Sequence, residues 1–156
     1  VKVADSFNMP RNTPKLSRFT VELQSNFPYA ESIQSTLEGE PDQYTFQEST
    51  FNVQNKGDVK IDPRSVLTPL RIIFQGESEN LEIFNADTGD VWTFEGTTTI
   101  DDQLVLDGVR YTLNGQSIFN QTNAGVITLK PGSNSFFLTG ITGDYEIKFD
   151  FRHYTL

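Results

Sequence analysis

The C-terminal stretch "DYEIKFDFRHY" constrains the fold more than any other part of the chain. Its alternate positions are apolar and charged, with Tyr145, Ile147, Phe149 and Phe151 in one set and Glu146, Lys148, Asp150 and Arg152 in the other. Side chains of a β-strand point alternately to its two faces. One face of this strand must therefore be buried, and the chain needs a second layer to bury it.

Turn signals recur through the second half of the chain. Asp87-Thr88-Gly89, Asp107-Gly108 and Asn114-Gly115 each lie between apolar segments, which is typical of hairpins, and Pro131-Gly132 repeats the form. "STFNVQN" and the continuous apolar run "LRIIFQG" indicate further strands. We predict an all-β chain of about nine to eleven short strands that forms an antiparallel β-sandwich of jelly-roll type.

The first part of the chain is less regular. Residues 1–18 hold two prolines and four basic residues without a sustained period, so we interpret them as a linker or arm. Residues 19–156 form the predicted single sandwich domain, beginning with the alternating segment "RFTVELQ". Tyr29, Ile33 and Leu37 recur every four positions, so residues 29–38 form either a short helix or an irregular loop.

Composition limits the classes of function. A chain of 156 residues buries enough surface to be stable without cross-links, and it contains no cysteine. Its net charge of −9 disfavours nucleic-acid binding, which depends on Lys and Arg. The apolar runs are too short to cross a bilayer. Because the chain starts at Val1, we interpret it as part of a longer polypeptide or as a processed chain.

The segment "NKGDVKIDPR", residues 55–64, gathers glycine, acids, cations and proline. Strand alternation predicts that Val59 and Ile61 point to one face and that Asp58, Lys60 and Asp62 point to the other. Pro63 ends the strand, and Asp62 is suited to an Asx turn, with Arg64 positioned to bind a carboxylate at the corner. We interpret this segment as a structural corner, since nothing in it requires a substrate.

The segment "FNVQNKGDVKIDPRSVLTPLRIIFQG" resembles the C-terminal half of distal tail proteins (Dit) of siphophages and Gram-positive prophages. The likeness continues in "FTVELQSNFPYAESI", "GDVWTFEGTTTIDDQLVLDGVRYTLNGQSIFNQTN", "GVITLKPGSNSF" and "FDFRHYTL". It covers residues 19–156 in family order and excludes residues 1–18. The family's ring-forming N-terminal domain has no counterpart in this chain.

This resemblance implies a structural virion component without enzymatic activity or cofactor. Such proteins form a hexameric ring at the tail tip that joins the tail tube to the tail-associated hub protein. Their C-terminal domain is a galectin-like or carbohydrate-module-like sandwich that projects outward, carries receptor-binding proteins or contacts the host surface. We therefore expect a hexameric full-length protein, a monomeric fragment, synthesis in a bacterial host and a location at the virion tail tip.

Residues with catalytic potential have plainer interpretations. His153 is the only histidine and lies three residues from the C-terminal residue, far from any nucleophile motif. The acid pairs Glu38/Glu40, Asp87/Asp90 and Asp101/Asp102 lie in turn-like contexts. Solvated loop acids explain these pairs better than glycoside hydrolysis or a calcium site does. We predict no catalytic residue and no metal site.

Two aromatic residues are weak candidates for ligand binding. Trp92 and Tyr111 are suited to stacking on a sugar if their rings are exposed, although a large aromatic residue on a sandwich strand more often belongs to the core. The alternative function is accordingly a carbohydrate-binding module that recognises host cell-wall glycan. A wall hydrolase is a third and weaker hypothesis.

Overall fold

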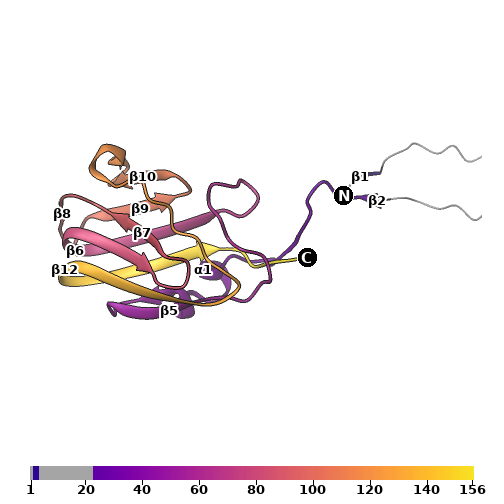
Figure 1. Ribbon diagram of the computed structural model, residues 1–156, viewed down its shortest axis with the longest axis horizontal. Coiled ribbons are helices and arrows are strands. Elements are labelled where there is room, and N and C mark those ends of the chain that lie inside the picture. The colour runs from indigo at the N-terminus through magenta and orange to yellow at the C-terminus, as the bar shows by residue number, and fades with distance from the viewer. Residues whose placement is uncertain (1, 4–22) are drawn as a thin grey trace, which may run out of the picture.

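Two long strands organise the fold. Strand β6 spans Leu70–Asn85 and β12 spans Gly132–Phe151, and the two pair antiparallel along most of their lengths. The computed structural model describes residues 2–3 and 23–156. Both strands bend at the left-hand end of the view in Figure 1, so that each contributes to two layers.

The bend arises where the two long strands carry β-bulges. Alternate residues of β6 are buried from Leu70 to Ser78, and the buried set then changes parity and resumes at Leu81. Asn80 lies between the two sets with φ 52°, and Gly140 on β12 has φ 85°. The register shifts on both sides of Ile141. Extra residues of this kind bend a strand, so the pair folds over here.

The folded sheet has nine strands in two antiparallel layers. Layer A contains the first half of β6 and the second half of β12, flanked by β4 (Thr45–Phe46), β9 (Gln103–Asp107), β10 (Arg110–Leu113) and β11 (Gln116–Ser117). Layer B contains the other two halves, flanked by β5 (Thr50–Asn55), β7 (Asp90–Thr93) and β8 (Thr97–Thr98). The β-sandwich predicted from the sequence is confirmed.

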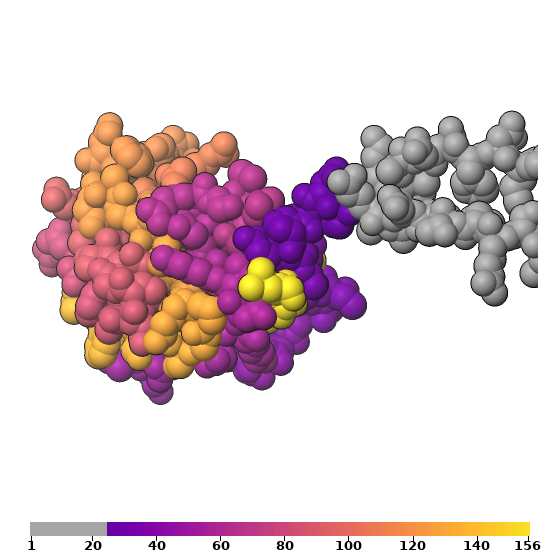
Figure 2. Space-filling view, turned by 45° about the vertical axis from the view of Figure 1, so that its right-hand side comes forward, coloured from indigo at the N-terminus to yellow at the C-terminus, as the bar shows by residue number. Residues whose placement is uncertain are grey.

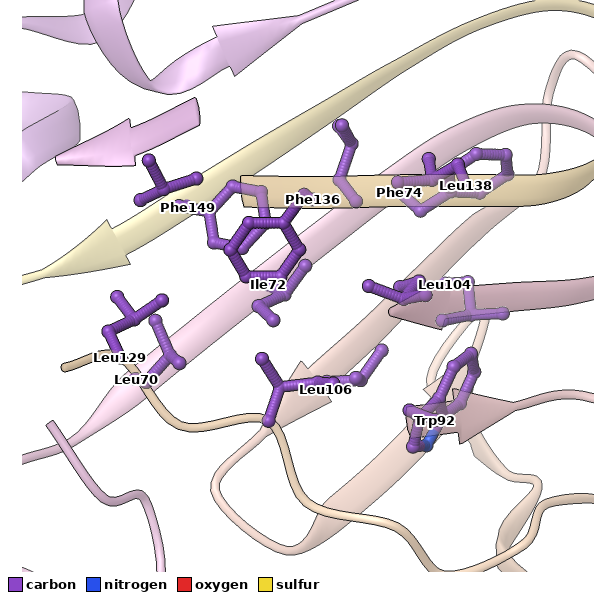
Figure 3. Close-up of a cluster of buried hydrophobic side chains, with 14 of the residues drawn as sticks. Leu70, Ile72, Phe74, Trp92, Leu104, Leu106, Leu129, Phe136, Leu138 and Phe149 are labelled. Atoms are coloured by element: carbon purple, nitrogen blue, oxygen red, sulfur yellow. The ribbon is translucent and has the colours of Figure 1, made fainter. Parts of the chain in front are cut away.

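The core lies between the two layers. Its side chains include Phe74, Leu81, Ile83, Trp92, Leu104, Phe136, Ile147 and Phe149, none of which is exposed to solvent. Figure 3 shows side chains of β6, β9 and β12 converging there, with Trp92 of β7 among them. The alternation predicted for the last strand is confirmed, because Ile147, Phe149 and Phe151 are buried.

Three predicted turns are confirmed. Residues 86–89 join β6 to β7, with Gly89 at φ 76°. Gly108 has φ 65° between β9 and β10. Asn114 and Gly115 have φ values of 50° and 81° between β10 and β11, as a two-residue hairpin turn requires.

Two other strand predictions are wrong. Residues 125–131 do not form a hairpin with β12, and the strand expected at residues 57–62 is reduced to a single bridge between Ile61 and Leu129. Both backbone polar groups of Lys130 bond to the buried side chain of Asn134. The Lys130 N–H donates to Asn134 Oδ1 at 2.9 Å, and Asn134 Nδ2 donates to the Lys130 carbonyl at 2.9 Å. At Lys130, hydrogen bonds to a side chain therefore take the place of the backbone hydrogen bonds that a hairpin with β12 would make.

The short helix is later and shorter than expected for residues 29–38. Helix α1 is one turn, Thr36–Gly39, and a 3-10 turn, η1, follows at Pro41–Tyr44. Ser35 caps α1, and its N–H donates to the Glu38 carboxylate at 2.9 Å. Ile33, which the helical stripe would bury, is 93% exposed. A second 3-10 turn, η2, spans Phe119–Gln121.

The segment that enters the sandwich, around residues 30–31, lies beside the C-terminal strand. Strand β3 (Ala30–Glu31) pairs with β13 (Tyr154–Thr155), and Figure 2 shows the yellow C-terminal residues beside the indigo segment. Strands β1 (Lys2–Val3) and β2 (Leu23–Gln24) form a separate pair. The rest of the predicted arm and the expected strand start at Phe19 lie outside the described residues. No helix among the described residues has the length and hydrophobicity needed to span a membrane.

Candidate functional site

The structure brings the two predicted ligand-binding residues together, but inside the protein. Trp92 is 0% exposed and Tyr111 is 2% exposed, and their ring centroids lie 5.7 Å apart at an interplanar angle of 67°. The Tyr111 hydroxyl donates to the carbonyl of Gly125, and burial raises the pKa of this phenol. Neither ring offers a face to a sugar, so the core interpretation of both residues is the correct one.

A different pair of aromatic residues lies on the outer surface of layer B. Phe84 on β6 is directly opposite Phe137 on β12, with ring centroids 6.2 Å apart and tilted by 33°. Phe137 is 41% exposed. In register on the flanking strands are Val91 of β7 and Thr50 of β5. These four residues form a row across the layer, which we call the aromatic row.

Polar residues border the aromatic row on both sides. Glu82, Thr93 and Thr139 form the next row toward the bend, and Asn52 and Ser135 form the row on the other side. Alternation along each strand places these side chains on the same face as the aromatic row. We call the whole surface the aromatic face. It combines an apolar centre, hydroxyl and amide groups, and one carboxylate.

Local sequence explains why these rings are exposed. Phe136 and Phe137 are consecutive in β12, so strand alternation sends one inward and the other outward, and Phe136 is 0% exposed. Ile83 and Phe84 are divided in the same way on β6, where Ile83 is buried. The Phe-Phe doublet was the signal available in the sequence for this site. The candidates predicted from the sequence were instead Trp92 and Tyr111.

The predicted corner at residues 62–64 is confirmed as a structural element. The Arg64 N–H donates to Asp62 Oδ1 at 3.1 Å, which closes the Asx turn. The Arg64 guanidinium donates to both oxygens of the same carboxylate, at 2.8 Å to Oδ1 and 2.6 Å to Oδ2. The side-chain bond to Arg64 is the main cause of the lowered pKa of Asp62. The Asp62 carboxylate and the Arg64 guanidinium thus form a local ion pair with each other.

Most of the other carboxylates with catalytic potential also have structural partners. Glu40 pairs with Lys56, Asp87 accepts bonds from Lys130 and Ser135, Asp90 accepts the N–H of Thr128, and Asp102 accepts bonds from Thr99 and Asn114. The bonds to Asp87 lower its pKa to about 2. Within the part of the chain that the structure describes, no three acidic or histidine side chains are arranged to hold a metal ion.

His153 lies at the end of the sandwich where β3 and β13 meet. Its Nδ1 accepts the Lys56 N–H at 3.2 Å, and its Nε2 lies 3.3 Å from the Tyr44 hydroxyl. These partners are a backbone amide and a phenol, so the ring is held as part of the structure.

Comparison with known proteins gives no family assignment. Neither a scan of protein-family models nor a search of curated proteins finds a match for this chain.

Proposed function

We propose that this chain is an interaction domain of a phage tail tip, the outward C-terminal domain of a distal tail protein. The sequence segments that resemble this family run through residues 19–156. The β-sandwich is the fold which that resemblance implies. In this role the domain binds other tail-tip proteins, such as a receptor-binding protein, or contacts the host surface.

The arrangement of the chain ends suits such a domain. Because β3 pairs with β13, the segment that leads into the sandwich and the C-terminal strand lie at the same end. A domain attached at one end leaves its sheet faces accessible. The aromatic face lies on the outer surface of layer B, away from the core between the layers.

The observation that carries the proposal is the half-exposed aromatic pair at the centre of this flat, polar-bordered surface. An apolar centre with a polar rim is the usual anatomy of a protein–protein interface. Four strands about 4.8 Å apart make the aromatic row only about 14 Å long. The surface is therefore smaller than the roughly 800 Å² per partner of a standard interface. Six copies on a ring would compensate for weak binding by each copy.

Virions provide the test. Antibodies against the sandwich, detected by gold labelling in electron microscopy, are expected to mark the tail tip, and the full-length protein is expected to form rings. Phe137→Gln in the full-length protein should reduce the amount of receptor-binding protein on purified virions. Phe119→Gln is the matched control, because Phe119 is 49% exposed but lies outside the aromatic face. Unlabelled tail tips and a monomeric full-length protein would refute the proposal.

Carbohydrate binding is the second candidate function. It is favoured by the Phe84–Phe137 pair, since exposed rings stack on sugars and the neighbouring Asn52, Thr139 and Ser135 carry hydrogen-bonding groups. Titration of the labelled protein with purified host-wall polysaccharide, followed by NMR, is the direct test. Shifts centred on the aromatic face would support this function, and unchanged spectra at millimolar sugar would exclude it.

A further inference from the structure

Three segments distant in the sequence meet around His153. The C-terminal residues 152–156 pair with the incoming residues 30–32 and also bond to the turn at residues 55–59. The His153 carbonyl accepts the N–H of Ser32 at 2.9 Å, and the Tyr154 carbonyl accepts the N–H groups of Asp58 and Val59 at 3.1 and 3.2 Å. We call this assembly the terminal clasp.

The contact at Gly57 is especially close. A Cβ added to Gly57 would lie 2.3 Å from the Tyr154 carbonyl oxygen and 2.7 Å from its nitrogen. The turn and the C-terminal strand therefore touch backbone to backbone, and a side chain at this position would separate them. Displacement of either segment must disturb the other.

The hydrogen bonds of His153 define its protonation state. The Tyr44 hydroxyl donates its single proton to the Gln54 carbonyl at 2.8 Å, so it must accept from the imidazole Nε2 at 3.3 Å. Nδ1 accepts from the backbone N–H of Lys56 at 3.2 Å. The ring is thus neutral, with its proton on Nε2. A second proton on Nδ1 would turn the Lys56 contact into two opposed donors.

Charged groups from several neighbouring segments surround the ring. The Lys56 ammonium opposes a positive imidazole, whereas Glu40, between α1 and η1, favours it, and these two side chains pair with each other. Arg152, which like His153 lies between β12 and β13, is 3.8 Å from Glu31 and 4.0 Å from Glu38. Asp58 accepts the Leu156 N–H at 3.0 Å. Burial and Lys56 together lower the pKa of His153.

We propose that His153 is the latch of an acid-sensitive clasp, and that protonation of its Nδ1 releases the C-terminal strand and the incoming segment from the sandwich. The ring also lines a surface depression of about 450 Å³ between residues 32–40 and Lys56, which gives water access to it. Release would leave the sandwich folded while freeing residues 30–32 and the C-terminal strand. This inference concerns the end of the sandwich where these two segments pair and does not depend on the proposed function.

The expected response follows from proton linkage. An open clasp exposes the imidazole, whose pKa then returns to about 6.5, above its value in the closed clasp. The open state therefore binds more protons, and closure is fully favoured above pH 6.5. As the pH falls below 6.5, the opening equilibrium increases by up to about tenfold per pH unit until the closed-state pKa is reached. His153 is the only histidine of the chain, so no other side chain has an ordinary pKa in this range.

Hydrogen exchange of the 156-residue chain tests the proposal. Protection factors, corrected for the intrinsic pH dependence of exchange, should fall for the Ser32 and Lys56 amides between pH 7.5 and 5. Amides of the paired β6 and β12 should keep theirs. His153→Asn places an amide oxygen near the Nδ1 position and cannot titrate, so its Ser32 and Lys56 protection should not depend on pH.

A second measurement covers the case in which the variant disturbs the fold. Imidazole ¹⁵N shifts of the wild-type protein should show a neutral ring with the proton on Nε2 at pH 7.5. A proton on Nδ1 at that pH would overturn the proposal. So would clasp protection that stays constant down to pH 5, or an unchanged pH dependence in a folded His153→Asn variant.

Discussion

Two glycines of β12 allow the fold-over of the sandwich to be tested quantitatively. Gly132 and Gly140 have almost the same backbone conformation, with φ of 84° and 85°. Their surroundings differ. A Cβ on Gly132 would meet nothing within 4 Å, whereas a Cβ on Gly140 would lie 2.5 Å from the Glu79 carbonyl oxygen and 2.6 Å from that of Asn80. Substitution by alanine therefore separates conformational strain from close approach.

The expected magnitudes follow from these two terms. A left-handed conformation costs an alanine about 1–2 kcal/mol, and both variants carry this cost. In Gly140→Ala the backbone of the facing bulge must also move, and overpacking of this kind costs about 1–3 kcal/mol more. The variants should thus differ in stability by about 2 kcal/mol. For a protein of this size that corresponds to roughly 4–8 °C in melting temperature.

Thermal and urea unfolding, followed by circular dichroism, measure this difference. Gly132→Ala is the matched control, because it lies on the same strand with the same φ. Equal losses in the two variants would show that the strands do not approach closely at the fold-over. A Gly140→Ala variant more stable than Gly132→Ala would refute the account of the bend altogether.

Three further predictions concern the core and two titrating groups. Asp87→Asn should remove the part of stability that the wild type loses as the pH falls from about 4 toward 2. The reason is that the pKa of Asp87 is about 2 in the folded protein and about 3.9 in the unfolded chain. Acid titration followed by circular dichroism measures the difference, and equal curves for variant and wild type would contradict the prediction. In urea unfolding, Trp92→Ala should reduce the free energy of unfolding by about 3–5 kcal/mol, whereas Phe137→Gln should change it by less than about 0.5 kcal/mol. Comparable losses would contradict the assignment of Trp92 to the core and of Phe137 to the surface. Burial raises the pKa of Tyr44 to about 12, so stability should fall as the pH rises from about 10 to 12. In an ultraviolet titration, the Tyr44→Phe variant should lack the phenol that ionises last in the wild type.

Local signals in the sequence predicted the elements that depend on local physics. The alternation in β12 and the glycine turns at Gly89, Gly108 and Gly115 are set within a few residues, and the structure has them. The Asp62–Arg64 corner is equally local, since both partners lie two residues apart.

Long-range contacts explain most of what could not be predicted. The apolar run "LRIIFQG" closes at Gly76, but in the structure Gly76, with φ 145°, lies within β6, directly opposite Tyr145. The strand continues because its partner on β12 carries compensating extra residues. The Ile61–Leu129 bridge likewise joins two segments far apart in the sequence, and the Asn134 side chain bonds to Lys130, the residue after Leu129. No pattern within either segment contains this information.

The candidate site shows the same division. Strand alternation predicts that Phe136 and Phe137 face opposite ways, but it does not predict which of them faces the core. That choice is made by the register with β6, which sets Phe137 against Phe84 and leaves Trp92 inside. Trp92 thus lies in the core, whereas Phe84 and Phe137 lie on the outer surface. Residue type alone was therefore a poor guide to the exposed surface.

Charge adds a constraint on what binds the aromatic face. The chain has a net charge of −9, so two copies repel each other, and Glu82 is the charged residue beside the aromatic row. Contact between two such faces would bring like carboxylates together around a small apolar area. A partner with an apolar projection and a nearby cation would instead gain from both features. The surface is accordingly better suited to a different protein than to a second copy of this chain, which agrees with the proposed role of an interaction domain.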